Sequence, residues 1–251
     1  MLRSLLTILV AALLIFFVFP ALVPHPENLS LPLIWLKDAP VSHLTVAGVF
    51  EETNKARLAN SAYPAFAHDE LLDKAATERL DNMFAEQYFE HYSPSGKGAS
   101  DAAENAHYEY VMIGENIAMG NFENDLVLVD AWMNSPGHRA NILKKDFSEI
   151  GIAVGQGTFK GKKTWIAVQV FAKPLSSCPK LDEGMKNTIE QYGKRIDAFR
   201  ARLSQMPKNT QEEIDQYNIV VAEANKLINT HKDLIFKYNA QVNAFNLCIK
   251  E

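Results

Sequence analysis

The stretch "NSPGHRANIL", Asn134 to Leu143, combines the signals of a helix start with a histidine, and it decides how the centre of the chain is interpreted. Pro136 suits the first position of a helix, because its missing N–H would have no partner there. Ser135 before it is a favourable N-cap residue. His138 then lies in the first turn, near the positive end of the helix dipole, where a protonated imidazole is disfavoured. The stretch therefore predicts a short helix that holds a neutral histidine.

The residues around this helix predict a mixture of helices and strands. The spacing of apolar residues predicts helices at residues 49–60, 69–89 and 124–134. Two strand-like runs, "EIGIAVGQG" and "TWIAVQVFA", follow the short helix and are joined by a segment that contains glycine. Because the helices and strands do not alternate regularly, the pattern favours an α+β fold over a doubly wound sheet.

The first 45 residues differ in character from the rest of the chain. Residues 1–23 include an uncharged apolar run that is about long enough to cross a bilayer core of ~30 Å. Arg3 precedes this run, which favours a cytoplasmic N-terminus and an extracytoplasmic main domain. We expect a transmembrane signal anchor at residues 1–23 and a proline-rich linker at residues 24–45. The alternative is a signal peptide whose cleavage would leave a secreted protein.

The C-terminal residues 176–251 follow a different pattern from the central domain, which we place at residues 46–175. Their apolar residues alternate spacings of three and four, and the tripeptide "PKN" interrupts this alternation. Thr210 and Glu213 form a capping box where the pattern resumes. We therefore expect an antiparallel helical hairpin of the coiled-coil type. Its apolar seam can close within the chain or pack against a protein partner.

The two cysteines, Cys178 and Cys248, bracket this hairpin. An extracytoplasmic setting permits a disulfide, which we expect, with two separate buried thiols as the alternative. Simple geometry opposes the pairing, because a turn centred near Lys208 places Cys178 opposite Tyr238, about 15 Å from Cys248 along a helix. A disulfide then requires a bent second helix, a longer turn, or a segment at Cys178 that doubles back.

Four residues of the central domain have side chains suited to metal binding or acid–base chemistry. His91 lies in "FEHYSP", Glu115 in "GENIA", and Glu149 in "FSEIGIA"; His138 is the fourth. Each of them taken alone has a structural explanation, such as the helix dipole for His91. A serine nucleophile is disfavoured, because the sequence lacks the G-x-S-x-G elbow and Ser135 is better explained as an N-cap.

Together these segments, in their order along the chain, resemble the CAP superfamily, also called the SCP domain. This family includes cysteine-rich secretory, antigen 5 and pathogenesis-related 1 proteins and many bacterial secreted proteins. "NKARLAN" resembles the family's first-helix Asn-x-x-Arg motif, here Asn54 and Arg57, and the resemblance covers residues 46–173. Thr53 replaces the histidine that often precedes this motif. The domain contains no cysteine, so it resembles the bacterial members.

The resemblance implies an α-β-α sandwich with a cleft that holds His91, Glu115, His138 and Glu149. A neutral imidazole suits a metal ion or a proton acceptor, and two histidines can bind Zn²⁺ or another divalent metal, with Glu115 and Glu149 supporting them or acting as a catalytic base. No single reaction is common to the family.

Three functions are therefore open. The first is a membrane-anchored module that binds a small molecule, lipid, glycan or peptide in its cleft. The second is a metal-dependent hydrolase of peptide or cell-wall material. The third is a structural or adhesive protein that acts through the hairpin. Nucleic acid is disfavoured as a partner, because the net charge is −5 and the sequence has no run of Lys and Arg.

Overall fold

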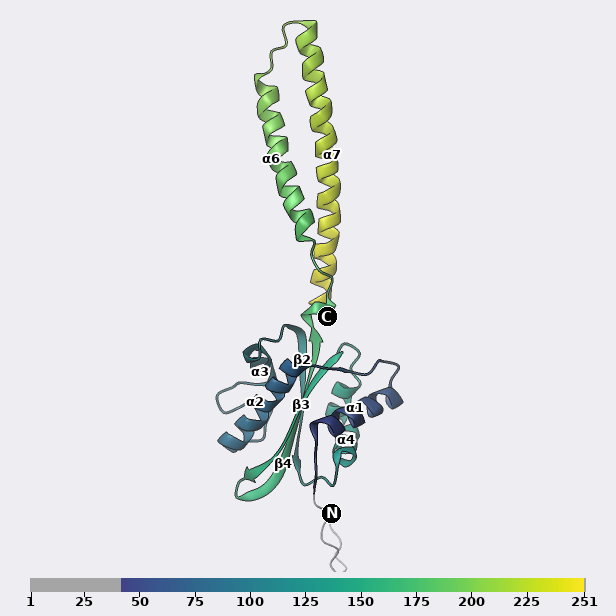
Figure 1. The fold of residues 1–251 in the computed structure, drawn as a ribbon, viewed down its shortest axis with the longest axis vertical. Helices are drawn as coiled ribbons and strands as arrows, with labels where there is room; N and C mark the ends of the chain where they lie inside the picture. The colour runs from purple at the N-terminus through teal and green to yellow at the C-terminus, as the bar shows by residue number, and fades with distance from the viewer. Residues whose placement is uncertain (1–41, 251) are drawn as a thin grey trace, which may run out of the picture. The chain divides into compact units, whose positions relative to one another are not determined.

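The computed structural model describes residues 42–250 (Figure 1). The predicted anchor at residues 1–23 and most of the predicted linker at residues 24–45 lie outside this range. Among the helices of residues 42–250, none is long and apolar enough to cross a membrane.

A four-stranded mixed sheet with the strand order β1-β3-β4-β2 forms the centre of the domain. Its strands are β1 (Ala67–His68), β2 (Tyr110–Gly120), β3 (Glu149–Phe159) and β4 (Lys162–Pro174). β1 runs parallel to β3, while the β3–β4 and β4–β2 pairs are antiparallel. Lys160 and Gly161 join β3 to β4 with positive φ angles of 47° and 79°, as a tight two-residue hairpin turn requires.

Helices cover both faces of this sheet (Figure 1). They are α1 (Val46–Asn60), α2 (Glu70–Glu86), α3 (Ala99–Asn105), α4 (Asp125–Asn134) and α5 (Pro136–Ile142). One apolar core lies between the sheet and α2 and α3. A second core lies between the opposite face of the sheet and α1, α4 and α5. The domain is therefore a mixed α+β fold with the layers of an α-β-α sandwich.

Local signals correctly predicted most of these elements. The three helices expected from apolar spacing are α1, α2 and α4, and the two expected strands are β3 and β4. α5 begins at Pro136 with Ser135 as its N-cap residue, although the Ser135 side chain makes no capping hydrogen bond. β1, β2 and α3 were not predicted from the sequence pattern. The run that forms β2 contains Gly114, Glu115 and Asn116 within apolar residues, which obscures the alternation typical of a strand.

The two motif residues of α1 have structural roles. Asn54 accepts a hydrogen bond from the backbone N–H of Phe66 and donates one to its carbonyl. Arg57 is buried, and its guanidinium donates to the backbone carbonyls of Pro64, Ile142, Lys144 and Phe147. These bonds fasten α1 to the loop before β1 and to the chain that leaves α5.

The C-terminal segment forms two helices that pack against each other, α6 (Glu183–Gln205) and α7 (Gln211–Cys248). Thr210 and Glu213 make the predicted capping box at the start of α7. The side chains buried in the hairpin are Ile196, Val220, Ala224 and Leu227. The hairpin agrees with the sequence pattern, whereas its pairing with a protein partner stays a prediction.

Cys178 and Cys248 form a disulfide, with Cα atoms 5.7 Å apart, so the expected pairing is confirmed. The geometric objection assumed helix throughout, but the backbone is extended at Cys178, before α6, and at Met206, after it. An extended residue advances about 3.3 Å and a helical residue about 1.5 Å. The extended residues at both ends of α6 therefore compensate for its shorter length, and α7 needs no bend. Lys173 of β4 also donates to the carbonyl of Cys248, at 3.0 Å.

Gly151 of β3 provides a test of how α2 packs on the sheet. A Cβ at this position would overlap the backbone of Leu72 and Asp73. We expect Gly151→Ala to lower the free energy of unfolding by about 2 kcal/mol or more, since overpacking a core costs ~1–3 kcal/mol. Urea unfolding of the full chain, followed by circular dichroism, measures this change.

Gly193 of α6 supplies the matched control, because the space around its Cβ position is open. Gly193→Ala should raise the stability of the hairpin by about 0.5–1 kcal/mol, the ordinary gain in a helix interior. A Gly151→Ala protein as stable as the wild type would contradict the packing of α2 described here.

Candidate functional site

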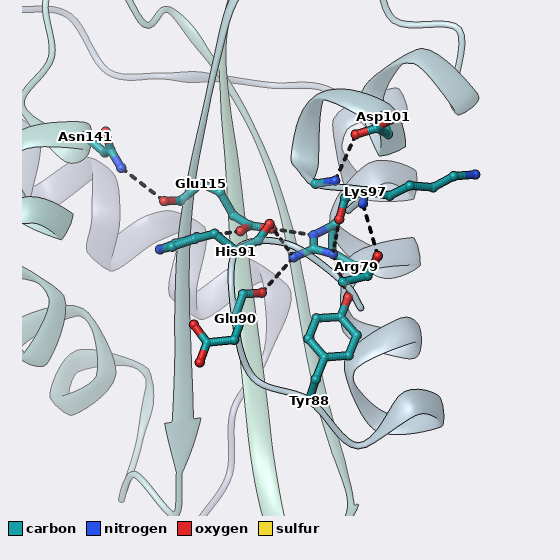
Figure 2. Close-up of polar contacts among 10 residues, drawn as sticks. Arg79, Tyr88, Glu90, His91, Lys97, Asp101, Glu115 and Asn141 are labelled. Carbon is teal, nitrogen blue, oxygen red and sulfur yellow. Dashed lines mark hydrogen bonds and ion pairs between the residues drawn. The ribbon is translucent and has the colours of Figure 1, made fainter. Parts of the chain in front are cut away.

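Glu115 of β2 lies at the centre of the candidate site (Figure 2). Its side chain is only 5% exposed, and its two carboxylate oxygens have different partners. Oε1 accepts a hydrogen bond from Nε of Arg79 at 2.8 Å, and Oε2 lies 2.7 Å from Nδ1 of His91. One buried carboxylate is therefore shared between a permanent cation and a titratable imidazole.

Arg79 of α2 connects this carboxylate to the loop that carries His91. Its guanidinium donates to the backbone carbonyls of Glu90 and His91, both at 2.9 Å, and to the hydroxyl of Tyr88 at 2.7 Å (Figure 2). A buried guanidinium needs such partners to offset its desolvation. Arg79 was not among the site residues predicted from the sequence. Its position on the apolar face of a helix, where a charge is unusual, was the available signal.

His91 is held in one orientation while its ring stays accessible. The hydrogen bond with Glu115 raises the pKa of His91 above its usual value, and partial burial of the ring opposes this shift. The side chain is 52% exposed. Because Glu115 engages Nδ1, Nε2 is the nitrogen that remains for a ligand.

His138 approaches the site from α5, on the other face of the sheet from α2. Burial lowers the pKa of His138, and the charge of His91 lowers it further. This lowered pKa agrees in direction with the neutral His138 that the sequence predicts. The backbone carbonyl of His138 accepts a hydrogen bond from Nδ2 of Asn116 at 3.1 Å. The two histidines thus favour different protonation states within one site.

A chain of buried amide groups supports the site from the α1 side. Nδ2 of Asn141 donates to the backbone carbonyl of Glu115 and to Oδ1 of Asn116. Asn116 donates in turn to Gln169 of β4 at 3.0 Å, and Gln169 donates to the hydroxyl of Thr53 at 2.7 Å. Thr53, which departs from the family pattern, accepts this hydrogen bond and donates its own hydroxyl to the backbone carbonyl of Val49 at 2.7 Å. The chain connects α1 and α5 through two strands.

Glu149 of β3 has a hydrogen-bond partner of its own. Its carboxylate accepts a hydrogen bond from the hydroxyl of Tyr108, and burial together with Glu149 raises the pKa of Tyr108. Glu149 belongs to β3, which is two strands away from β2 in the sheet, a separation of about 10 Å. His91 and Glu115 are in direct contact, and the charge of His91 acts on His138, while Glu149 lies on a different strand with Tyr108 as its partner.

The arrangement does not fit the expected zinc centre. Within residues 42–250, no group of three or more His, Cys, Asp or Glu side chains is placed to hold a metal ion. Zinc sites use three or four protein ligands, whereas both oxygens of Glu115 are already engaged by Arg79 and His91. The chemistry that this geometry supports is hydrogen bonding and proton transfer by the two imidazoles.

A cavity of about 360 Å³ opens beside His91. Its lining comes from the loop after α2, the start of α3 and the strand β2: His91, Tyr92, Ala99, Ser100, Ile113, Gly114 and Glu115. The ring of Tyr92 is 67% exposed at this cavity. A ligand in the cavity would therefore meet an imidazole, an aromatic ring and the edge of the sheet.

Comparison with known proteins relates the domain to one family. Residues 50–171 match the model of the family described as CAP, the cysteine-rich secretory protein family. The chain is 39% identical over 104 residues to the protein YkwD of Bacillus subtilis, covering 41% of this chain and 40% of YkwD. It is 31% identical over 86 residues to the membrane protein YlbC of the same organism, covering 34% of this chain and 25% of YlbC. The match spans less than half the length of either relative.

Solved structures include similar chains. An extracellular protein containing a SCP domain from Bacillus anthracis is 26% identical, with 51% of this chain and 40% of that chain covered and a TM-score of 0.43. An outer surface protein from Borrelia burgdorferi is 21% identical, with 50% of this chain and 90% of that chain covered and a TM-score of 0.41.

We expect the two histidines to titrate on opposite sides of the usual imidazole pKa. The pKa of His91 is raised by Glu115, and the pKa of His138 is lowered by burial and by His91. Histidine ring signals in NMR spectra, recorded across the acid and neutral range, measure both values. His91→Asn and His138→Asn assign the signals. Equal pKa values, or the reverse order, would contradict the site geometry.

The same shifts determine how each histidine contributes to the pH dependence of folding. The stability from His91 is fully present below its unfolded pKa of about 6.5 and is lost as the pH rises through its folded pKa. The stability from His138 is present above about 6.5 and is lost as the pH falls through its folded pKa. Urea unfolding at a series of pH values measures both contributions. His91→Asn should remove the loss of stability that occurs as the pH rises, and His138→Asn should remove the loss of stability that occurs as the pH falls.

Proposed function

Because residues 50–171 form a domain of the CAP family, we propose that this protein is an extracytoplasmic module whose cleft binds a ligand at His91 and His138. The observation that carries the proposal is the Glu115–His91 pair. A fixed, buried carboxylate holds one nitrogen of an imidazole whose ring borders an open cavity. A pair that served folding alone would gain little from a half-exposed partner.

The protonation states of the two histidines indicate which ligand groups the cleft accepts. His91 favours the charged form and offers an N–H donor, while neutral His138 offers an acceptor. A ligand with an anionic or carbonyl oxygen near a hydroxyl or amide donor matches this pair. Small molecules, glycans and peptides all carry such groups.

A hydrolase of peptide or cell-wall material is the second candidate. It is favoured by the neutral imidazole of His138 close to an imidazole that is oriented by a carboxylate, as in a general base and general acid. The histidines, rather than a metal, would carry the proton in this arrangement.

The extracytoplasmic location and the membrane anchor are also part of the proposal. Residues 1–23 have the length and the flanking charge of a signal anchor. The Cys178–Cys248 disulfide fits an oxidising compartment, and the relative YlbC is described as a membrane protein.

Calorimetry with soluble cell-wall fragments tests the cleft directly. We expect His91→Asn and His138→Asn each to weaken binding by about tenfold or more, because each removes a hydrogen bond to a polar or charged group. His43→Asn, at an exposed position before α1, is the matched control and should bind as the wild type does. Mass spectrometry of the same samples over time detects hydrolysis. Unchanged binding by both cleft variants would refute the proposed site.

Fractionation of cells that produce the full chain tests the anchor. We expect the protein in the membrane fraction, and we expect removal of residues 1–23 to abolish its membrane association. N-terminal sequencing of the mature protein is the decisive measurement. A mature chain that starts after residue 23 would establish the cleaved signal peptide instead.

A further inference from the structure

β2 is an edge strand, and its outer side carries backbone groups. Within the described sheet, β2 pairs with β4 alone. The indole N–H of Trp132 donates to the carbonyl of Ile117 at 3.3 Å, and Asn141 donates to the carbonyl of Glu115 at 3.1 Å. Peptide groups along a strand point alternately to its two sides. Ile113 therefore shares the outward orientation of Glu115 and Ile117.

Side chains cover one part of this edge, and a cavity borders another. Proteins commonly cover the exposed edges of their sheets. Here the side chains of Trp132 and Asn141 cover the edge at Ile117 and Glu115, because they donate to the carbonyls of these residues. The stretch Ile113–Glu115 lines the cavity of about 360 Å³ that also contains His91. The N–H and C=O of Ile113 and the N–H of Glu115 thus lie on the cavity side, next to the imidazole.

We propose that the cleft binds an extended peptide, which adds to the edge of β2 at Ile113–Glu115 and passes beside His91. This inference rests on the proposed ligand-binding function and names the ligand class. Outward peptide groups recur every second residue, a repeat of about 6.8 Å, and an extended polypeptide presents complementary groups at the same repeat. Glycans and lipid chains lack this alternation of donors and acceptors.

The rest of the cavity suits the side chains of such a peptide. Ala99 and Ser100 are small, so the start of α3 leaves room beside the strand. The exposed ring of Tyr92 offers an apolar surface at the cavity. Arg79 alone offsets the single negative charge of Glu115, so an acidic peptide would not meet an uncompensated carboxylate.

A proline scan of the edge tests the proposal on the solubilised full-length protein. The probe is a library of short synthetic peptides of mixed sequence, and the selected binder is then measured by calorimetry. Ile113→Pro removes an outward N–H that β4 does not use, and proline is tolerated on edge strands. We expect it to weaken peptide binding by about tenfold or more.

Met119→Pro is the matched control. Met119 has the same outward register on β2 but does not line the cavity, so this variant should bind the peptide within about twofold of the wild type. Circular dichroism confirms that both variants fold. N-methylation of the bound peptide, one residue at a time, should abolish binding at every second position.

The outcomes separate this inference from the proposed function. Binding that is insensitive to Ile113→Pro, N-methylation effects without a two-residue period, or a library without any binder would each overturn the peptide proposal. If soluble glycan strands bind and His91→Asn abolishes that binding, the peptide proposal fails while the cleft function stands. If His91→Asn changes the binding of neither probe, both fail.

Discussion

The buried ion pair between Arg79 and Glu115 is the interaction on which the domain's functional geometry depends. Removing two charges from water is costly, and the cost is offset only when their remaining donors and acceptors are satisfied. Here the guanidinium meets that requirement with the carbonyls of Glu90 and His91 and the hydroxyl of Tyr88. The need to satisfy these two buried charges therefore fixes α2, the loop that carries His91 and the strand β2 relative to one another. The orientation of His91 is a consequence of it.

The opposite face of the sheet is organised by the guanidinium of Arg57 and by neutral amide groups. Arg57 ties α1 to the chain after α5, and the amide chain from Thr53 to Asn141 passes through the buried residues Asn116 and Gln169. Buried amides that are fully hydrogen-bonded restrain their neighbours, because any shift leaves a donor or acceptor unpaired. His138 is therefore carried on a helix whose position is restrained from within the core. Both histidines reach the cleft from rigid supports, which favours a preorganised site.

The sequence was informative where the signals are local. Caps, proline at a helix start and apolar spacing are properties of neighbouring residues, so α1, α2, α4, α5, β3 and β4 were predictable. Strand order is not local, so the sequence pattern alone did not reveal that Glu115 and Glu149 lie on strands separated by β4. The role of Arg79 was equally hidden, since its partners come from a loop and from a strand that the pattern did not reveal. His91, Glu115 and His138 were predicted together only through their resemblance to a family. The structure shows His91 and Glu115 in direct contact, and the zinc expected with them does not fit this arrangement.

The disulfide between Cys178 and Cys248 also changes what a protease can do to this protein. It closes a covalent ring around both helices of the hairpin, with the connection near Met206 at the far point of the ring. A single cut in that connection would open the ring without separating the two pieces, because α7 would still be attached to the domain through sulfur. Release of α7 from the domain would then require two chemical events, cleavage of the chain and reduction of the disulfide. In an oxidising compartment such as the one proposed, where reductants are scarce, that combination would protect the hairpin against release by proteases.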